Sequence, residues 1–314
     1  MKIKKNVLAA ALISGRARRS DLSTKRRKTY QIEFFSDELE KRQLLATYSY
    51  SSGLLTVQTN STNEQLSIIS ASESGNYTIT TSGAWSGTAG SGLSNTSTIL
   101  YVNQPSGLAS ILVNDNGTVS NSSFRFGLSS ANFVSNLTVN FTNSTSGVIT
   151  VANSASFING MNLNLTTTGN QITVSNLTSA NSTGSIRLTG RNIVVTGNIT
   201  TAAGDIFLTG NNGSYQTGSF HGVQVSGNSG NTVYVNTTSG NITIDGRGGL
   251  NTACSGVWLS ESNVQAGGSG CVTITGVSGN GTDLNGYSGV GVYASRSTVM
   301  TSSGSITLNG TSSG

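Results

Sequence analysis

Side chains able to do chemistry are few in this 314-residue chain, and carboxylates are the most promising of them. Cleavage of a polysaccharide would need two carboxylates, or one with a lysine or arginine, on the same face. Asp205 and Asp245 occupy different slots of a repeated phrase and are predicted to lie two coils apart. No catalytic pair is therefore expected. The acids beyond residue 46 are Glu64, Glu73, Asp115, Asp205, Asp245, Glu261 and Asp283.

His221 is the single histidine of the sequence. A metal site or a general base would need partners, and no cluster of cysteine and histidine surrounds it. In the other copies of its phrase, Ser255 and Ser288 take its place. We therefore expect His221 to be an exposed corner residue, and we predict no catalytic, cofactor or metal site.

The two cysteines, Cys254 and Cys271, are separated by 17 positions. A coil of that length would stack them and allow a disulfide, which export to an oxidising compartment permits. Their neighbours place them in different slots, because Cys271 aligns with Asn241 and Ser305 whereas Cys254 aligns with Phe220. Two free thiols are therefore expected, and they are too few for a zinc site.

The elements that must position these residues are set by a short repeated phrase. Each copy has apolar residues third and fifth, polar residues between them and glycine at both ends. A strand-and-turn unit repeated along a chain predicts a solenoid, in which each unit buries its apolar face on the next. The five copies are GSIRLTG (184–190), GDIFLTG (204–210), GNITIDG (240–246), GCVTITG (270–276) and GSITLNG (304–310).

A second phrase alternates with the first, as HGVQVSG around Gly222, SGVWLSE around Gly256 and SGVGVYA around Gly289. The simplest interpretation is that each phrase opens a coil, so that two coils make one repeat of 30–36 residues. The alternative is one large coil for each pair of phrases. Between Gly184 and Gly204, three short strands fit one turn of a three-faced helix of strands.

The predicted fold is all-β, a right-handed parallel β-helix with an N-terminal cap region and a short leader that is partly helical or disordered. We assign residues 1–46 to a basic export leader, 47–125 to the β-rich cap and first coils, and 126–314 to β-helix repeats. The repeats are expected to be truncated at the C-terminus. Residues predicted to point inward are Ile186, Leu188, Val223, Val225, Ile242, Ile244, Ile306 and Leu308.

Charge is concentrated in the leader. Residues 1–46 contain 12 of the 17 Lys and Arg residues, whereas the remainder contains 5 basic and 7 acidic residues. A nucleic-acid-binding protein needs its basic footprint on the folded surface, so the overall charge of +5 does not predict that function. No apolar run is long enough for a transmembrane helix.

The end of the leader carries a recognisable motif. The segment LEKRQLLA (39–46) resembles the L-E-x-R-x-L-L leader motif of large exported planctomycete proteins, whose repeat-rich region begins just after it. In this chain the low-charge composition also begins there, at Thr47. The resemblance implies export and no catalytic role. The motif residues are Leu39, Glu40, Arg42, Leu44, Leu45 and Ala46.

The alternating phrases GSITLNG and HGVQVSG resemble the β-helix repeats of filamentous-haemagglutinin-like and autotransporter-passenger-like surface proteins. That resemblance implies a secreted or cell-surface, outer-envelope protein with an adhesive or structural role and no enzymatic activity. Expected partners are surface carbohydrate or another surface protein, and a second copy through an open C-terminal coil. The alternative is a carbohydrate-active β-helix enzyme similar to polysaccharide lyases and hydrolases.

Overall fold

The computed structural model describes the chain from residue 46 onward, and the predicted leader helix and motif residues Leu39 to Leu45 lie outside the described residues. Ala46, the last residue of the motif, is the buried first residue of strand β1. Segments within the body that are not described are 61–62, 71–75, 88–91, 104–106, 116–121, 127–130, 134, 143–146, 152–154, 158–159, 180–182, 212–215, 252–253, 281–288 and 313–314.

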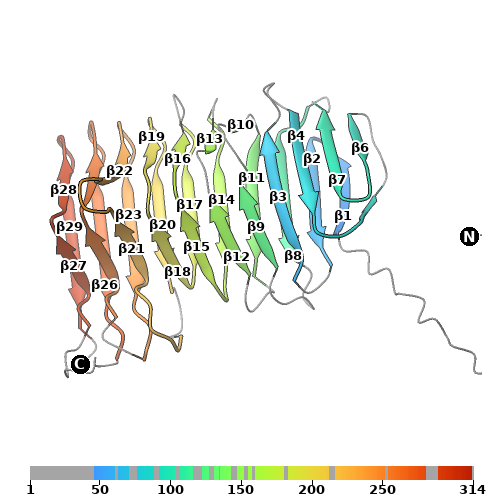
Figure 1. The fold of residues 1–314 in the computed structure, drawn as a ribbon. Coiled ribbons are helices and arrows are strands. Elements are labelled where there is room, and N and C mark those ends of the chain that lie inside the picture. Colours follow the sequence, from blue (N-terminus) through green and yellow to red (C-terminus); the bar gives the residue numbers. More distant parts are fainter. Residues whose placement is uncertain are drawn as a thin grey trace, which may run out of the picture. The chain divides into compact units, whose positions relative to one another are not determined.

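The described residues form strands and no helices, which confirms the all-β prediction, and the strands make three long sheets (Figure 1). The first sheet contains, in spatial order, β29 (Ile306–Thr311), β26 (Val272–Val277), β23 (Ile242–Arg247), β20 (Ile206–Gly210), β17 (Ile186–Gly190), β14 (Leu163–Thr167), β11 (Asn136–Phe141), β8 (Ser110–Asp115), β2 (Leu54–Thr59), β1 (Ala46–Ser51) and β5 (Trp85–Gly87). The second contains β27 (Val292–Ser295), β24 (Val257–Ser260), β21 (Val223–Ser226), β18 (Asn192–Val195), β15 (Gln171–Val174), β12 (Val148–Val151), β9 (Ser123–Phe126), β3 (Gln65–Ser70), β4 (Asn76–Thr81), β7 (Ile99–Asn103) and β6 (Leu93–Asn95). The third contains β10 (Ala131–Phe133), β13 (Ala155–Phe157), β16 (Leu177–Ser179), β19 (Ile199–Thr201), β22 (Val233–Thr237), β25 (Ser262–Ala266) and β28 (Thr298–Thr301).

From β8 onward the chain visits the three sheets in a fixed order, and we call each passage through first, second and third sheet a coil. Each strand pairs in parallel with the strand three places further along, as β17 does with β20 and β18 with β21. Parallel strands require such crossover connections, since a tight hairpin can join only antiparallel neighbours. Figure 1 shows the resulting stack of strands, coloured in sequence order from one end to the other.

The core lies between the sheets, where apolar side chains of equivalent strands stack in columns. Alternation of apolar and polar residues produces this arrangement, because successive side chains of a strand point to opposite faces. Each buried leucine or isoleucine contributes roughly 1.5–3 kcal/mol. One column of the first sheet, with every member at most 1% exposed, is Leu55, Ile111, Leu137, Leu163, Ile186, Ile206, Ile242 and Val272.

The two alternating phrases belong to one coil, so the simplest interpretation of their spacing was wrong. All five copies of the first phrase form strands of the first sheet, whereas β21, β24 and β27 of the second sheet carry the second phrase. Ile186, Ile206, Ile242, Val272 and Ile306 pair in succession, so these coils span 20, 36, 30 and 34 residues. The loops needed for such long coils are placed at one corner.

Two corners of the coil behave differently. From β19 onward, the constant corner joins the third sheet to the first through segments of four or five residues, whereas the variable corner joins the first sheet to the second through segments of very different length. The constant corner comprises residues 202–205, 238–241, 267–271 and 302–305. The variable corner comprises residue 191 and residues 211–222, 248–256 and 278–291.

Glycines at both ends of the first phrase are required by close backbone packing. At the constant corner, a Cβ added to Gly240 would overlap the carbonyl oxygen of Gly204, one coil earlier. Gly270 and Gly304 meet the preceding glycine in the same way. At the base of the variable corner, a Cβ on Gly246 would overlap the carbonyl oxygen of Gly256. The glycine at this base brings the two strands together whatever the length of the intervening loop.

A polar ladder also runs along the constant corner, one residue after these glycines. Each side chain except that of the last member accepts a hydrogen bond from the backbone N–H of its equivalent one coil later, with distances from 2.7 to 3.5 Å. Such bonds fix the register between coils, since the donors would otherwise have no partner in the stack. The ladder consists of Asn136, Asn162, Ser185, Asp205, Asn241, Cys271 and Ser305.

The two ends of the stack differ. Near the N-terminus the pairing becomes antiparallel, between β1 and β2 and through β3, β4, β7 and β6. At the other end β29 is the outermost strand of the first sheet, and Ile306 and Leu308 are 44% and 55% exposed. As predicted, the two residues stack on their equivalents one coil away. Their equivalents Val272 and Ile274 are fully buried, because β29 packs on them.

Within the described residues, no helix is long and apolar enough to cross a membrane.

Candidate functional site: a polar groove on the second sheet

The outward face of the second sheet carries a column of side chains that changes in character along the stack. Strand register aligns Thr173 with Val194, Val194 with Gln224, Gln224 with Trp258 and Trp258 with Tyr293. Polar and small side chains therefore give way to aromatic ones toward β27. The groove lies where this change occurs.

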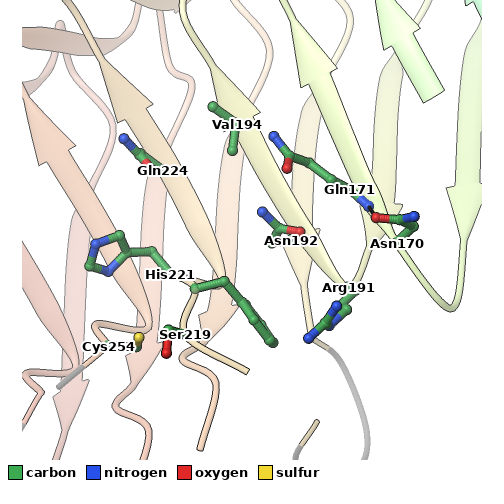
Figure 2. Close-up of a pocket in the computed structure, with 10 residues that line it drawn as sticks. Asn170, Gln171, Arg191, Asn192, Val194, Ser219, His221, Gln224 and Cys254 are labelled. Carbon is green, nitrogen blue, oxygen red and sulfur yellow. Dashed lines mark hydrogen bonds between the residues drawn. The ribbon is translucent and has the colours of Figure 1, made fainter. Parts of the chain in front are cut away.

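Amide side chains supply the floor and one wall of the groove, which has a volume of about 620 Å³. Gln171 is the first residue of β15 and Asn170 precedes it, Asn192 is the first residue of β18, and Gln224 belongs to β21. Gln171 and Asn192 are register partners, and Figure 2 shows them with Gln224 on neighbouring strands. An amide offers both donors and an acceptor, so the wall can bond to hydroxyl groups in either sense.

The variable corner supplies the opposite wall. Ser219, Phe220 and His221 precede β21, and Cys254 belongs to the same corner one coil later. These residues are present because the connection from β20 to β21 is long, whereas residue 191 alone joins β17 to β18. The groove is therefore the step between a coil with a minimal corner and the next coil with an extended one.

Arg191, at the minimal corner, provides the positive charge of the groove. Its guanidinium lies over the ring of Phe220, 4.5 Å from the centroid, and it donates a hydrogen bond to the carbonyl oxygen of Thr217. Both contacts hold the guanidinium beside the wall, since a cation is attracted to the face of an aromatic ring. The described side chains that line the groove include no carboxylate.

His221 is part of an aromatic stack and is only partly exposed, which corrects the expectation of an exposed corner residue. Its ring lies 4.6 Å from that of Trp258, which in turn stacks on Tyr293 at 4.0 Å. The backbone N–H of Ser255 donates to Nδ1 at 3.0 Å, so Nε2 carries the hydrogen of the neutral ring. Burial lowers the pKa of His221, and the ring is neutral at pH 7.

The predicted equivalents of His221 also need correction. Strand register aligns Val257 with Val292, two residues later than the phrase alignment assumed. The residue that matches Gly256 is therefore Gly291, and the residue at the His221 position of that coil is Val290 instead of Ser288. Cys254 correspondingly lies against Gly289, whose added Cβ would overlap its carbonyl oxygen.

A second hollow of about 510 Å³ lies on the same sheet toward the N-terminus. Its lining includes Ser67 from β3, Thr80 from β4, Arg125 from β9 and Thr150 from β12. Register pairs Arg125 with both Ser67 and Thr150, so the hollow belongs to the same outward column as the groove. The second sheet thus carries two polar depressions, each with one arginine.

Asp205 and Asp245 do not face one another, which agrees with the prediction from the sequence. They lie in adjacent coils, however, and not two coils apart as predicted. Asp205 belongs to the polar ladder, where its Oδ1 accepts from the backbone and side-chain nitrogens of Asn241 at 2.7 and 3.2 Å. Asp245 points outward beside Thr209. Burial raises the pKa of its carboxyl, and the positive charge of Arg247 partly offsets this effect.

Both cysteines are free thiols, which confirms that prediction. Cys271 is a member of the polar ladder, and its Sγ accepts from the hydroxyl of Ser305 at 3.3 Å and from its backbone N–H at 3.5 Å. These bonds lower the pKa of the Cys271 thiol. Cys254 is buried at the groove wall. Among the described residues, no group of three or more His, Cys, Asp and Glu side chains could hold a metal ion.

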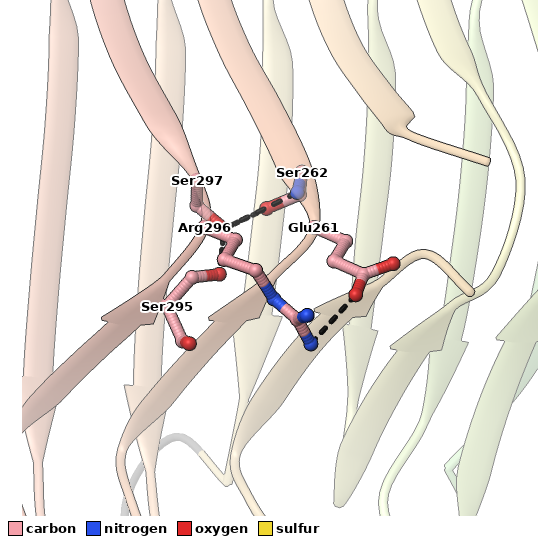
Figure 3. Close-up of polar contacts among 5 residues, drawn as sticks. All are labelled: Glu261, Ser262, Ser295, Arg296 and Ser297. Atoms are coloured by element: carbon pink, nitrogen blue, oxygen red, sulfur yellow. Dashed lines mark hydrogen bonds and ion pairs between the residues drawn. The ribbon is translucent and has the colours of Figure 1, made fainter. Parts of the chain in front are cut away.

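An ion pair joins adjacent coils at the corner between the second and third sheets. Arg296 Nη2 lies 2.7 Å from Glu261 Oε1, and Ser297 Oγ lies 3.1 Å from Ser262 Oγ beside it (Figure 3). Glu261 and Arg296 both have positive φ, of 47° and 49°. The pair lies on the far side of the second sheet's strands from the variable corner and is not among the groove residues.

Sequence reasoning missed the groove residues Arg191, Phe220 and Gln224. A usable signal was present, because Arg191 directly follows the phrase GSIRLTG and is the only residue between two strands. No family model, no curated protein and no solved structure matches this chain.

Proposed function

We propose that this chain is an exported cell-surface protein whose body is a right-handed parallel β-helix with a structural or adhesive role. The observation that carries the proposal is the repeated passage through three sheets with outward side chains that are mostly polar and uncharged. A stack of this kind presents long, solvated faces for recognition, as repeat proteins do. Right-handed winding is expected from the general preference of parallel crossover connections.

The antiparallel strands near the N-terminus support a cap over the first coils, since they would cover the otherwise open end of the parallel stack. The leader motif at Leu39–Ala46 supports export, and Ala46 is the first residue of strand β1. A second copy of the chain or another surface protein is the first type of partner. In this proposal surface carbohydrate is the second type of partner.

Export is tested with residues 1–46 fused to a reporter in a planctomycete host, beside a variant carrying Leu44→Asp and Leu45→Asp. The expected result is export of the first fusion and retention of the second. Surface display is tested by adding protease to intact cells that make the full chain. Protection in intact cells together with digestion after lysis would contradict the proposal.

A carbohydrate-active enzyme is the alternative. It would require a carboxylate pair, or a carboxylate with a base, at a groove. The described lining of the groove on the second sheet consists of four amides, one hydroxyl, one thiol, Val194, Phe220, Arg191 and His221. These groups suit binding, and release of reducing ends from acidic polysaccharides by the purified chain would favour the enzyme instead.

A further inference from the structure

The groove at β15, β18 and β21 has the chemistry of a site for a hydroxyl-rich anion. Four amide side chains, Asn170, Gln171, Asn192 and Gln224, present donors and acceptors along it. Neighbouring hydroxyls of a sugar ring need both, because each hydroxyl donates one hydrogen bond and accepts others. Its volume of about 620 Å³ falls within the usual range for ligand pockets.

Arg191 selects the charge of the ligand. Its guanidinium is held against Phe220 and bonded to the carbonyl oxygen of Thr217, so little side-chain freedom remains to be lost on binding. The fork of N–H donors on a guanidinium matches a carboxylate in a two-pronged arrangement. The described groove lining contributes no acidic side chain that would repel such a ligand.

His221 and its stack complete the opposite wall. The neutral ring offers an Nε2–H donor, since Nδ1 already accepts from Ser255. Its stacking on Trp258 fixes the ring plane and places an indole directly behind the groove wall. A ligand that contacts His221 therefore changes the surroundings of one of the two tryptophans of the chain, the other being Trp85 in the N-terminal region.

We propose that this groove binds a segment of an acidic polysaccharide built from uronic acids, with Arg191 holding a carboxylate and the amide side chains holding ring hydroxyls. The inference rests on the proposed adhesive function and names its ligand class. It assigns the groove to carboxylated sugars and not to neutral ones.

The test is a fluorescence and calorimetric titration of the purified full chain with an oligomer of galacturonic acid, compared with the same oligomer after methyl esterification. We expect the acid form to bind and to change the Trp258 emission, with the esterified form at least tenfold weaker. In Trp258→Phe the emission change should vanish while the calorimetric signal remains. Equal binding of both oligomers, or binding of neither, would overturn the inference.

Arg191→Gln should weaken binding of the acid oligomer about tenfold or more, because a charge-assisted hydrogen bond is lost. Arg191→Lys keeps the charge without the planar fork, so its affinity for the acid oligomer should lie between those of the unmodified chain and Arg191→Gln. Arg187→Gln is the matched control, since Arg187 makes the same kind of stack, 3.9 Å over Phe207, on the outward face of the first sheet. An equal loss in both glutamine variants would refute a site at this groove.

Failure of this inference is distinguishable from failure of the proposed function. Export of the 1–46 fusion and protease accessibility on cells are measured without any sugar ligand. If the chain is displayed on the surface but does not bind uronic acids, the proposed function stands and the proposed ligand class is rejected. Urea unfolding of each variant shows whether a loss of binding comes from a loss of folding.

Discussion

The constant corner of the coil holds successive coils together, whereas the variable corner supplies residues of the candidate site. At the constant corner, the glycine column of Gly204, Gly240, Gly270 and Gly304 and the polar ladder beside it bring successive coils into contact. At the variable corner, the connection changes from residue 191 alone in one coil to residues 211–222 in the next. The groove residues Ser219, Phe220, His221 and Cys254 all come from the variable corner.

The difference shows how a repeated chain can vary without losing register. Loops are tolerated where the glycine at their base keeps the strand ends together, because extra residues then project outward and leave the buried columns unchanged. Lengthening a surface loop costs little free energy, since closure entropy grows only with the logarithm of its length. The constant corner has less freedom, because its glycine and its ladder residue contact their equivalents in the next coil.

The largest expected effect is at the glycine column. Gly240→Ala would place a methyl group on the carbonyl oxygen of Gly204, and backbone must move to admit it. We expect a loss of roughly 3 kcal/mol in the free energy of unfolding, at the upper end for overpacking. Urea denaturation measures it. Gly310→Ala is the control, because the nearest atom there is Val292 N at 3.3 Å, and equal losses would contradict the steric account.

The polar ladder should contribute less. Asp205→Ala removes the acceptor for two nitrogens of Asn241, and we expect a loss of about 1 kcal/mol or less in the free energy of unfolding, because both hydrogen bonds are exposed to solvent. Asp205→Asn retains an acceptor oxygen and should keep most of the stability. Thermal unfolding of both variants and of the unmodified chain measures this difference. An alanine variant as stable as the asparagine variant would contradict a stabilising role for the ladder.

His221 of the variable corner should make folding stability depend on pH. The pKa of His221 is lowered by burial in the folded state, whereas its ordinary value is 6.5. Between pH 6.5 and the lower folded-state pKa, the unfolded chain therefore binds more protons at His221 than the folded chain does. The free energy of unfolding decreases as the pH falls through that window. His221→Gln should flatten this dependence, measured as the urea midpoint at pH 7.5 and 5.5. Asp245 has a raised pKa, so its contribution has the opposite sign and would remain in this variant.

The smallest effect is expected at the corner between the second and third sheets. Arg296→Ala breaks the ion pair with Glu261, but the arginine side chain is 75% exposed, and water and salt screen the interaction. A loss below about 0.5 kcal/mol is expected, and it should shrink further in 0.5 M salt. A loss as large as that of Asp205→Ala would show that this corner also holds the register.

Much of the fold could be predicted from the pattern of apolar residues. Ile186, Leu188, Ile242 and Ile244 were expected to point inward and do so, because period-two alternation leaves one buried face. The number of phrases per coil could not be settled in this way. A second-sheet strand and a first-sheet strand have the same alternation, and only the pairing of β17 with β20 and of β18 with β21 separates them.

The candidate site was harder to predict than the fold. Arg191 and Phe220 are 29 positions apart in the sequence, and their contact depends on a long corner in one coil lying against a minimal corner in the coil before. Gln224, Trp258 and Tyr293 are likewise related by position, since an amide and two aromatic side chains share no pattern in the sequence. Their shared column appears when the register is known.

The strand content, the burial pattern, the glycine at each corner and the placement of charge in residues 1–46 can be read from the sequence. These are local properties, fixed by alternation, side-chain volume and composition. The length of each coil, the equivalence of the phrases and the side chains that meet at the groove required the folded structure. Those features depend on contacts between residues 20 to 36 positions apart, and their spacing varies from coil to coil.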